Sequence, residues 1–190
     1  MPSAHLLRVY RRSFPVCICL FLEVVNMFPE RVLYLTVEGV VVPRTVTRTQ
    51  LAAAEPCRWS ECRHLTYLAD MVEPLEQVGI VLNSVWLPAL DMKTISDILP
   101  QRLRNRVIGA TARGNRVLRR GKLHAAVGRR EHLDADVQRR QPRQLIVLEC
   151  DACSVPVPLR SNAVIVPHGL WAATSDEWRH LADKLTTRIN

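Results

Sequence analysis

Two polar side chains follow a short apolar run near residue 35 and have the spacing of a pair that acts together. Residues 32–35 have the character of a buried strand, Thr36 ends the run, and Glu38 follows two residues later. Residues i and i+2 of a strand project from one face, so Thr36 and Glu38 are expected to point the same way. A threonine hydroxyl becomes a nucleophile only with the help of a base, and a carboxylate can serve as one. The spacing makes Thr36 and Glu38 candidate catalytic residues.

Polar side chains also end two later apolar runs, residues 80–82 and 145–148. Open α/β sheets bind ligands at the carboxyl ends of their strands, so side chains at three such ends are expected to share one pocket. A basic helix pattern precedes the later run. The remaining candidate residues of the pocket are Asn83, Ser84, Arg129, Arg130, Glu149 and Asp151.

Alternating strand and helix patterns must position these side chains. Buried strands are expected at residues 32–36, 80–84, 107–109, 145–148 and 163–166. Helices are expected at 61–77, with Pro74 bending or ending the first one early, after a cap at Asp91, at 129–140, and after a capping box at 174–177. Residues 44–58 and 114–128 are expected to be loops. This alternation predicts an α/β fold: a three-layer, doubly wound and mainly parallel sheet.

The order of these segments resembles the four motifs of the haloacid dehalogenase (HAD) superfamily of phosphatases, whose first motif reads Asp-x-Asp-Gly. Residues 36–39 read Thr-Val-Glu-Gly at that place. A closer resemblance is to a small bacterial HAD-domain group associated with RNA-repair proteins. It is carried by the sequence Asn-Ser-Val-Trp-Leu at 83–87, Leu-Glu-Cys-Asp at 148–151 and Pro-His-Gly-Leu at 167–170. The resemblance implies a HAD-like Rossmannoid fold for the chain from residue 27 onward.

The resemblance also implies a role for each candidate residue. It places Thr36 at the nucleophile position and Glu38 at the acid/base position. It implies that Asn83 or Ser84 binds the phosphoryl oxygens and that Arg129 or Arg130 neutralises the phosphate charge. It also implies that Glu149 and Asp151 bind Mg²⁺.

Three departures from the family pattern argue against the inherited reaction. Thr36 stands where the family has an aspartate nucleophile, Glu38 is one methylene longer than aspartate, and Cys150 replaces an acidic residue. Thiol sulfur is a soft ligand that suits magnesium badly, so at most weak Mg²⁺ binding is expected. We expect an inactive or weakly active phosphatase that binds a phosphorylated ligand. The alternatives are a Mg²⁺-dependent phosphohydrolase with an altered nucleophile and a nucleic-acid-associated module.

The positive charge of the chain is concentrated in one block. The whole chain carries a formal charge of +8, whereas residues 101–143 hold twelve arginines and one lysine against two aspartates and one glutamate, a net charge of +10. Such a block attracts phosphate groups or nucleic acid, or it is simply a solvated basic face. The chain has no aromatic residue between Leu87 and Leu170, which argues against base stacking within the block.

Residues 1–26 differ in character from the rest of the chain. Arginines precede an apolar run at 15–22, as in a signal peptide, but Glu23 follows the run and it is too short to span a bilayer. No membrane partner is expected. The segment is an upstream extension from a misplaced start codon, an ordered extra element, or a targeting segment. Met27 lies directly before the entry to the first strand, so we expect the HAD-like domain implied by the resemblance to span residues 27–190.

The six cysteines do not define a disulfide framework in a chain of 190 residues. Free thiols in a reducing cytoplasm are the simpler interpretation. The sequence therefore predicts a cytoplasmic protein.

Overall fold

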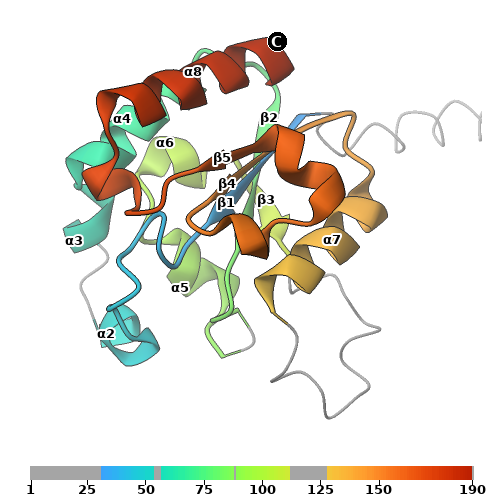
Figure 1. The fold of residues 1–190 in the computed structure, drawn as a ribbon. Coiled ribbons are helices and arrows are strands. Elements are labelled where there is room, and N and C mark those ends of the chain that lie inside the picture. The colour runs from blue at the N-terminus through green and yellow to red at the C-terminus, as the bar shows by residue number, and fades with distance from the viewer. Residues whose placement is uncertain (1–30, 54–56, 88, 112–127, 190) are drawn as a thin grey trace, which may run out of the picture.

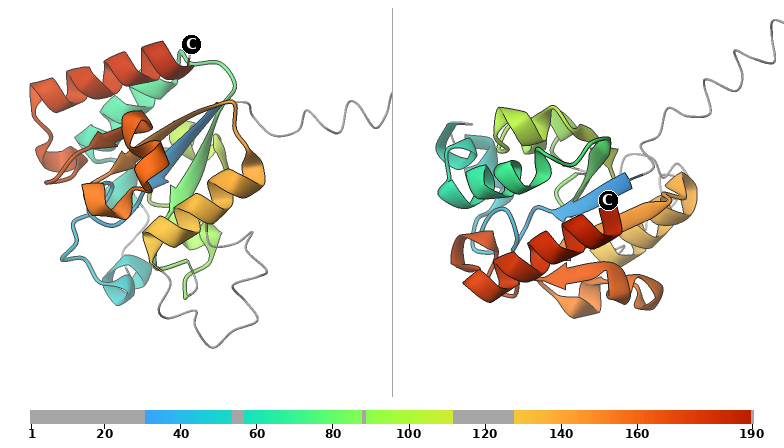
Figure 2. Two further views of the ribbon diagram at one scale, coloured as in Figure 1. Left: turned by 45° about the vertical axis from the view of Figure 1, so that its right-hand side comes forward. Right: turned by 90° about the horizontal axis from the view of Figure 1, so that it is seen from above.

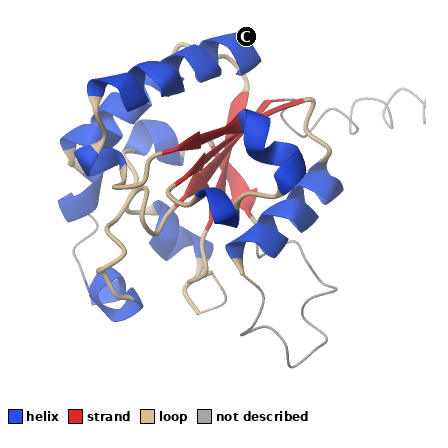
Figure 3. Cartoon of the chain, in the orientation of Figure 1, coloured by secondary structure: helices blue, strands red, loops and turns tan. Residues whose placement is uncertain are grey.

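A single parallel sheet forms the centre of the fold. The computed structural model describes residues 31–53, 57–87, 89–111 and 128–189. Its five strands are all parallel, in the order β3-β2-β1-β4-β5 (Figure 1, Figure 3). They are β1 (Arg31–Thr36), β2 (Val78–Asn83), β3 (Val107–Ala110), β4 (Gln144–Glu149) and β5 (Ala163–Ile165). The predicted doubly wound α/β fold is confirmed.

Helices cover both faces of the sheet, because β1 alternates its apolar side chains between them. Leu33 and Leu35 pack into a core with α4 (Arg63–Val72), α5 (Met92–Ser96), α6 (Gln101–Arg104) and α8 (Ser175–Ile189). Val32 and Tyr34 pack on the opposite face, against α7 (Arg129–Arg140) (Figure 1, Figure 2). The three layers leave the carboxyl ends of β1, β2 and β4 side by side.

Local capping signals set two helix starts as expected. Asp91 accepts a hydrogen bond from the Thr94 amide at 2.7 Å and so begins α5. At α8 the capping box is reciprocal: the Thr174 amide donates to Glu177 at 2.7 Å, and the Glu177 amide donates to the Thr174 hydroxyl at 3.2 Å. The first long helix, α4, ends at Val72, two residues before Pro74.

The expectation of a plain loop at 44–58 was wrong. This stretch holds α2 (Arg48–Ala53) and the start of α3 (Cys57–Ser60), which are both too short to show a helical apolar period. The sequence patterns also missed α6 and the 3₁₀ turns η2 (Ala152–Ser154), η3 (Val157–Asn162) and η4 (Leu170–Ala172).

Several expectations concern residues outside the described ranges. The extension predicted at 1–26, most of the loop predicted at 114–128 and the middle of the basic block are among them. Within the described ranges, no helix has the length and apolar character that crossing a membrane requires.

Candidate functional site

A tight turn after β1 places the first candidate residues. Gly39 has a φ of +87°, a backbone conformation that other residues rarely adopt. A Cβ atom at this position would lie 2.5 Å from the Cys150 sulfur, so glycine also permits the turn to touch β4. The turn is tied to its neighbours by backbone bonds from the Val37 amide to Asn83 (3.1 Å) and from the Leu170 amide to Val40 (3.0 Å).

Thr36 and Glu149 form a buried pair across the ends of β1 and β4. The Thr36 hydroxyl donates to Glu149 Oε2 at 2.9 Å, and neither residue has any exposed surface. Glu149 Oε1 accepts from the Cys150 amide at 2.8 Å and lies 3.2 Å from Arg129 Nη2. Both oxygens of this carboxylate therefore have donors within the protein.

Arg129 joins this pair to Glu38. It is the first residue of α7, and its side chain is only 12% exposed. Nη1 donates to the Glu38 carbonyl oxygen at 2.7 Å and lies 3.7 Å from Glu38 Oε2, while Nη2 faces Glu149. One guanidinium thus bridges oxygens that come from two strand ends.

Glu38 points toward the end of β2 rather than toward Thr36. The Ser84 hydroxyl donates to Glu38 Oε1, and the Trp86 amide donates to the same oxygen at 3.2 Å. Burial raises the pKa of the Glu38 carboxyl, and the Ser84 hydrogen bond opposes that shift. Oε2 has no hydrogen-bond partner and faces Arg129 at the longer ion-pair distance.

Cys150 fills the space between the turn and Arg44. Arg44 Nη2 lies 3.1 Å from the Cys150 sulfur, and the sulfur is 3.5 Å from the Glu38 carbonyl oxygen. Burial raises the pKa of the Cys150 thiol, which favours the neutral thiol at neutral pH. Cys150 therefore contributes packing and a weak donor rather than a negative charge.

The structure brings some predicted site residues together and separates others. Asn83 is buried beside the site, where its side-chain oxygen accepts from Thr111 at 3.0 Å. Arg130 is exposed on α7. Asp151 caps η2 through the Cys153 amide at 2.9 Å, which lowers the pKa of its carboxyl. The residues that converge are Thr36, Glu38, Ser84, Arg129 and Glu149.

Sequence reasoning missed two contributors to this site. Arg44 lies on the segment expected to be a loop, and nothing in its local pattern links it to Cys150. The Trp86 amide is a backbone donor, so its side-chain type gives no signal for that role.

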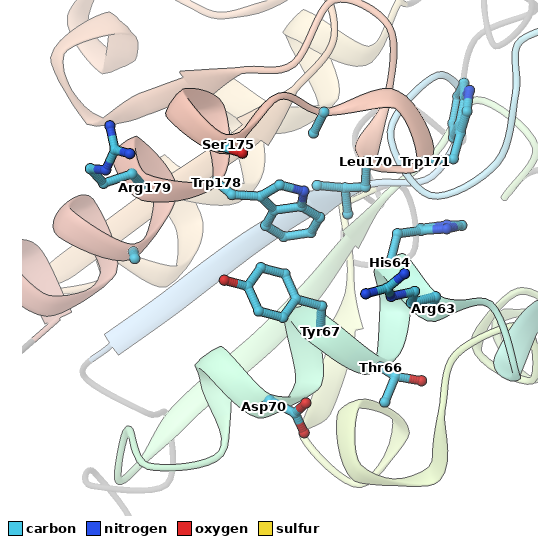
Figure 4. A pocket seen from close by; sticks show the side chains of 12 residues that line it. Arg63, His64, Thr66, Tyr67, Asp70, Leu170, Trp171, Ser175, Trp178 and Arg179 are labelled. Atoms are coloured by element: carbon cyan, nitrogen blue, oxygen red, sulfur yellow. The ribbon is translucent and has the colours of Figure 1, made fainter.

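A separate groove lies away from the strand ends, between α4 and the segment from η4 to α8. It has a volume of about 990 Å³. Tyr67 and Trp178 face each other there, edge to face, with ring centroids 4.8 Å apart (Figure 4). Trp171 lies farther along beside His64, and Arg63 and Arg179 stand at the rim. Tyr67 is 50% exposed and Trp171 is 39% exposed, so both rings are accessible.

The parallel strand order and the polar cluster at three strand ends are consistent with an α/β protein of the HAD-like class. A family model described as the HAD domain in Swiss Army Knife RNA repair proteins matches residues 32–182. The chain belongs to this family, as its resemblance to the RNA-repair-associated group predicted. No curated protein and no solved structure matches the chain.

HAD domains generally use Mg²⁺, and the donor set of this chain does not fit that ion. Glu149 already has donors on both carboxylate oxygens, Asp151 is engaged in capping η2, and Cys150 offers sulfur. Magnesium requires oxygen ligands in near-octahedral geometry. Across the described parts of the chain, no three His, Cys, Asp or Glu side chains are grouped as metal ligands would be.

Proposed function

We propose that this chain is a HAD domain that has lost, or nearly lost, phosphatase activity and serves as a folded binding module. The observation that carries the proposal is the position of Arg129, whose guanidinium bridges Glu38 and Glu149 inside the site. The Arg129 guanidinium lies between the two carboxylates and pairs with each of them. Neither carboxylate is then free to act on a substrate.

The position of Thr36 supports the same conclusion. An attacking oxygen must come within about 3–3.5 Å of the phosphorus atom. Thr36 has no exposed surface, and its hydroxyl proton is directed at Glu149. A hydroxyl bonded to a carboxylate is also the arrangement of a base-activated nucleophile, which keeps the altered-nucleophile hydrolase as the alternative to be tested.

A phosphorylated ligand at this site would have to displace Glu38. Of the four residues expected to bind phosphate (Asn83, Ser84, Arg129 and Arg130), Ser84 and Arg129 converge in the site. Ser84 donates to Glu38, and Arg129 contacts Glu38 and Glu149. A phosphate anion would also approach two buried carboxylates, which repel it. The ligand of this module is therefore more readily accommodated elsewhere on the surface.

Hydrolysis of p-nitrophenyl phosphate in the presence of Mg²⁺ tests the proposal. The wild type, Glu149→Gln and Asp151→Ala are expected to show the same rate as buffer alone. Turnover by the wild type that Thr36→Val abolishes would instead support Thr36 as the nucleophile, with Glu149 as its base. Turnover lost in Asp151→Ala would establish a magnesium-dependent reaction.

The aromatic groove between α4 and α8 favours a second candidate function, binding of single-stranded nucleic acid. Exposed aromatic rings stack on bases of any sequence, and arginine side chains attract the phosphate backbone. Tyr67, Trp171 and Trp178 supply the rings, and Arg63 and Arg179 supply the charges. The RNA-repair proteins for which the family is described make RNA the natural probe.

Titration of a fluorescein-labelled oligouridine at several salt concentrations tests this candidate. Tyr67→Ala is expected to weaken binding by about 1–3 kcal/mol if a base stacks on the ring. The variant Arg119→Ala/Arg120→Ala, in the basic block outside the described ranges, tests whether that block binds the RNA instead. A loss of affinity in that variant alone would place RNA on the block, and no binding by the wild type would contradict the candidate.

A further inference from the structure

Two aromatic rings of the groove between α4 and α8 are supported by the protein and remain accessible. Trp171 folds back over Gly169, where φ is +80° and an added Cβ atom would lie 2.2 Å from the indole ring. Tyr67 meets Trp178 edge to face, with ring centroids 4.8 Å apart, and Trp178 packs against the core. Rings that are already held in place lose little side-chain freedom when a ligand stacks on them.

The two accessible rings belong to separate positions along the groove. Trp171 has His64 as its ring neighbour, with centroids 6.3 Å apart, whereas Tyr67 has Trp178. No ring contact joins the two pairs within the described part of the chain. The groove volume of about 990 Å³ lies at the upper end of the range of about 300–1,000 Å³ for ligand pockets. The groove can therefore hold more than one planar group.

The charges along the groove favour an anionic ligand. Asp70, on α4, pairs with Arg102 at 2.7 Å. Arg179, on α8, pairs with Asp176 at 2.6 Å. Arg63, the first residue of α4, has no ion pair with any carboxylate that the structure describes. A guanidinium binds phosphate oxygens as it binds a carboxylate, so Arg63 suits the phosphate of a ligand whose bases stack on the rings.

We infer that the groove binds two consecutive unpaired nucleotides of RNA, with one base on Tyr67, the next base on Trp171 and the phosphate that joins them on Arg63. Such a site rests on the nucleic-acid binding proposed above and specifies the length of the bound segment. Arg63 and Tyr67 are four residues apart on α4, so they share one face of the helix, with Cβ atoms about 5–6 Å apart. In the view of Figure 4, the Arg63 side chain lies between Tyr67 and Trp171.

Calorimetric titration with two matched ligands tests the number of stacked bases. The dinucleotide UpU and the methyl ester of uridine 3′-phosphate each carry one phosphodiester charge, but only UpU has a second base. The wild type is expected to bind UpU about 10-fold more tightly. Tyr67→Ala and Trp171→Ala are each expected to lose this preference. Tyr67→Phe and Trp171→Tyr keep a stacking ring and should keep the preference, which separates loss of the ring from loss of the fold.

The salt dependence of binding tests the role of Arg63. The slope of log affinity for the labelled oligouridine against log salt concentration should be shallower by about 0.7 in Arg63→Gln, because one phosphate contact is lost. Arg48→Gln is the matched control, since Arg48 is exposed on α2 and does not line the groove. This control should keep the wild-type slope.

Equal affinity of the wild type for UpU and for the one-base ligand would overturn the inference and leave the candidate function in place. A wild-type preference in Trp171→Ala, or a wild-type salt slope in Arg63→Gln, would also overturn it. No binding of oligouridine by the wild type would contradict the candidate function itself. A dimer in sedimentation velocity that Tyr67→Ala dissociates would assign the groove to a second copy of the chain instead.

Discussion

Thr36 is the residue at which this site departs furthest from a phosphatase. A family aspartate at this position carries a charge, whereas Thr36 offers a hydroxyl whose proton is held by Glu149 at 2.9 Å. Glu149 in turn is held by Arg129 and by the Cys150 amide. The hydroxyl therefore satisfies a buried carboxylate, and the bond has a structural role that does not require chemistry.

Replacement of Thr36 by valine tests that structural role. Valine keeps the shape of threonine but removes the donor to Glu149 Oε2, and a buried acceptor that loses its donor costs about 1–3 kcal/mol of unfolding free energy. Thr36→Ser keeps the hydroxyl and is the matched control. Urea unfolding followed by circular dichroism measures both. Equal stability of the two variants would show that the hydrogen bond contributes nothing.

The turn after β1 is the element on which the site depends. Its Val37 amide donates to the Asn83 carbonyl oxygen, and its Val40 carbonyl oxygen accepts from the Leu170 amide. The His64 ring on α4 lies 3.3 Å from the Val41 carbonyl oxygen. Two segments far apart in the sequence, α4 and the Gly169-Leu170 stretch, therefore position Glu38 and Gly39. Burial lowers the pKa of His64, so the folded protein favours the neutral ring.

The stability of the domain should fall as the pH drops below 6.5, the ordinary pKa of histidine. In that range the unfolded chain binds a proton at His64 and the folded chain resists it, so protonation draws the equilibrium toward the unfolded state. Glutamine at position 64 keeps a donor for Val41 and does not titrate. Unfolding free energies at several pH values should therefore fall less steeply for His64→Gln than for the wild type. His180→Gln, on the exposed side of α8, is the control and should show the pH dependence of the wild type. A wild-type unfolding free energy that falls no more steeply with pH than that of His64→Gln would contradict the prediction.

At the scale of the whole molecule, the sequence was sufficient to predict the parallel sheet and the edge at which the site lies. Strand ends of a parallel sheet meet at one edge, so the convergence of Ser84 and Glu149 with Thr36 followed from the strand pattern alone. The helix expected at 129–140 has those bounds in the structure.

The pairing of side chains within the site could not be predicted in this way. The strand ends at Thr36, and Glu38 lies in the turn beyond it, so the period of two no longer holds between them. Thr36 consequently pairs with Glu149, and Glu38 with Ser84. The capping role of Asp151 depends on η2, a 3₁₀ turn of three residues with no sequence period to reveal it.

A crystal structure of the wild type soaked with Mg²⁺ and tetrafluoroberyllate tests the central claim most directly. A closed site predicts that Arg129 keeps its contacts to Glu38 and Glu149, with neither the metal nor the phosphate mimic at the strand ends. Mg²⁺ held by Glu149 and Asp151, with the anion on Ser84 and Arg129, would contradict the claim and establish a working phosphatase site.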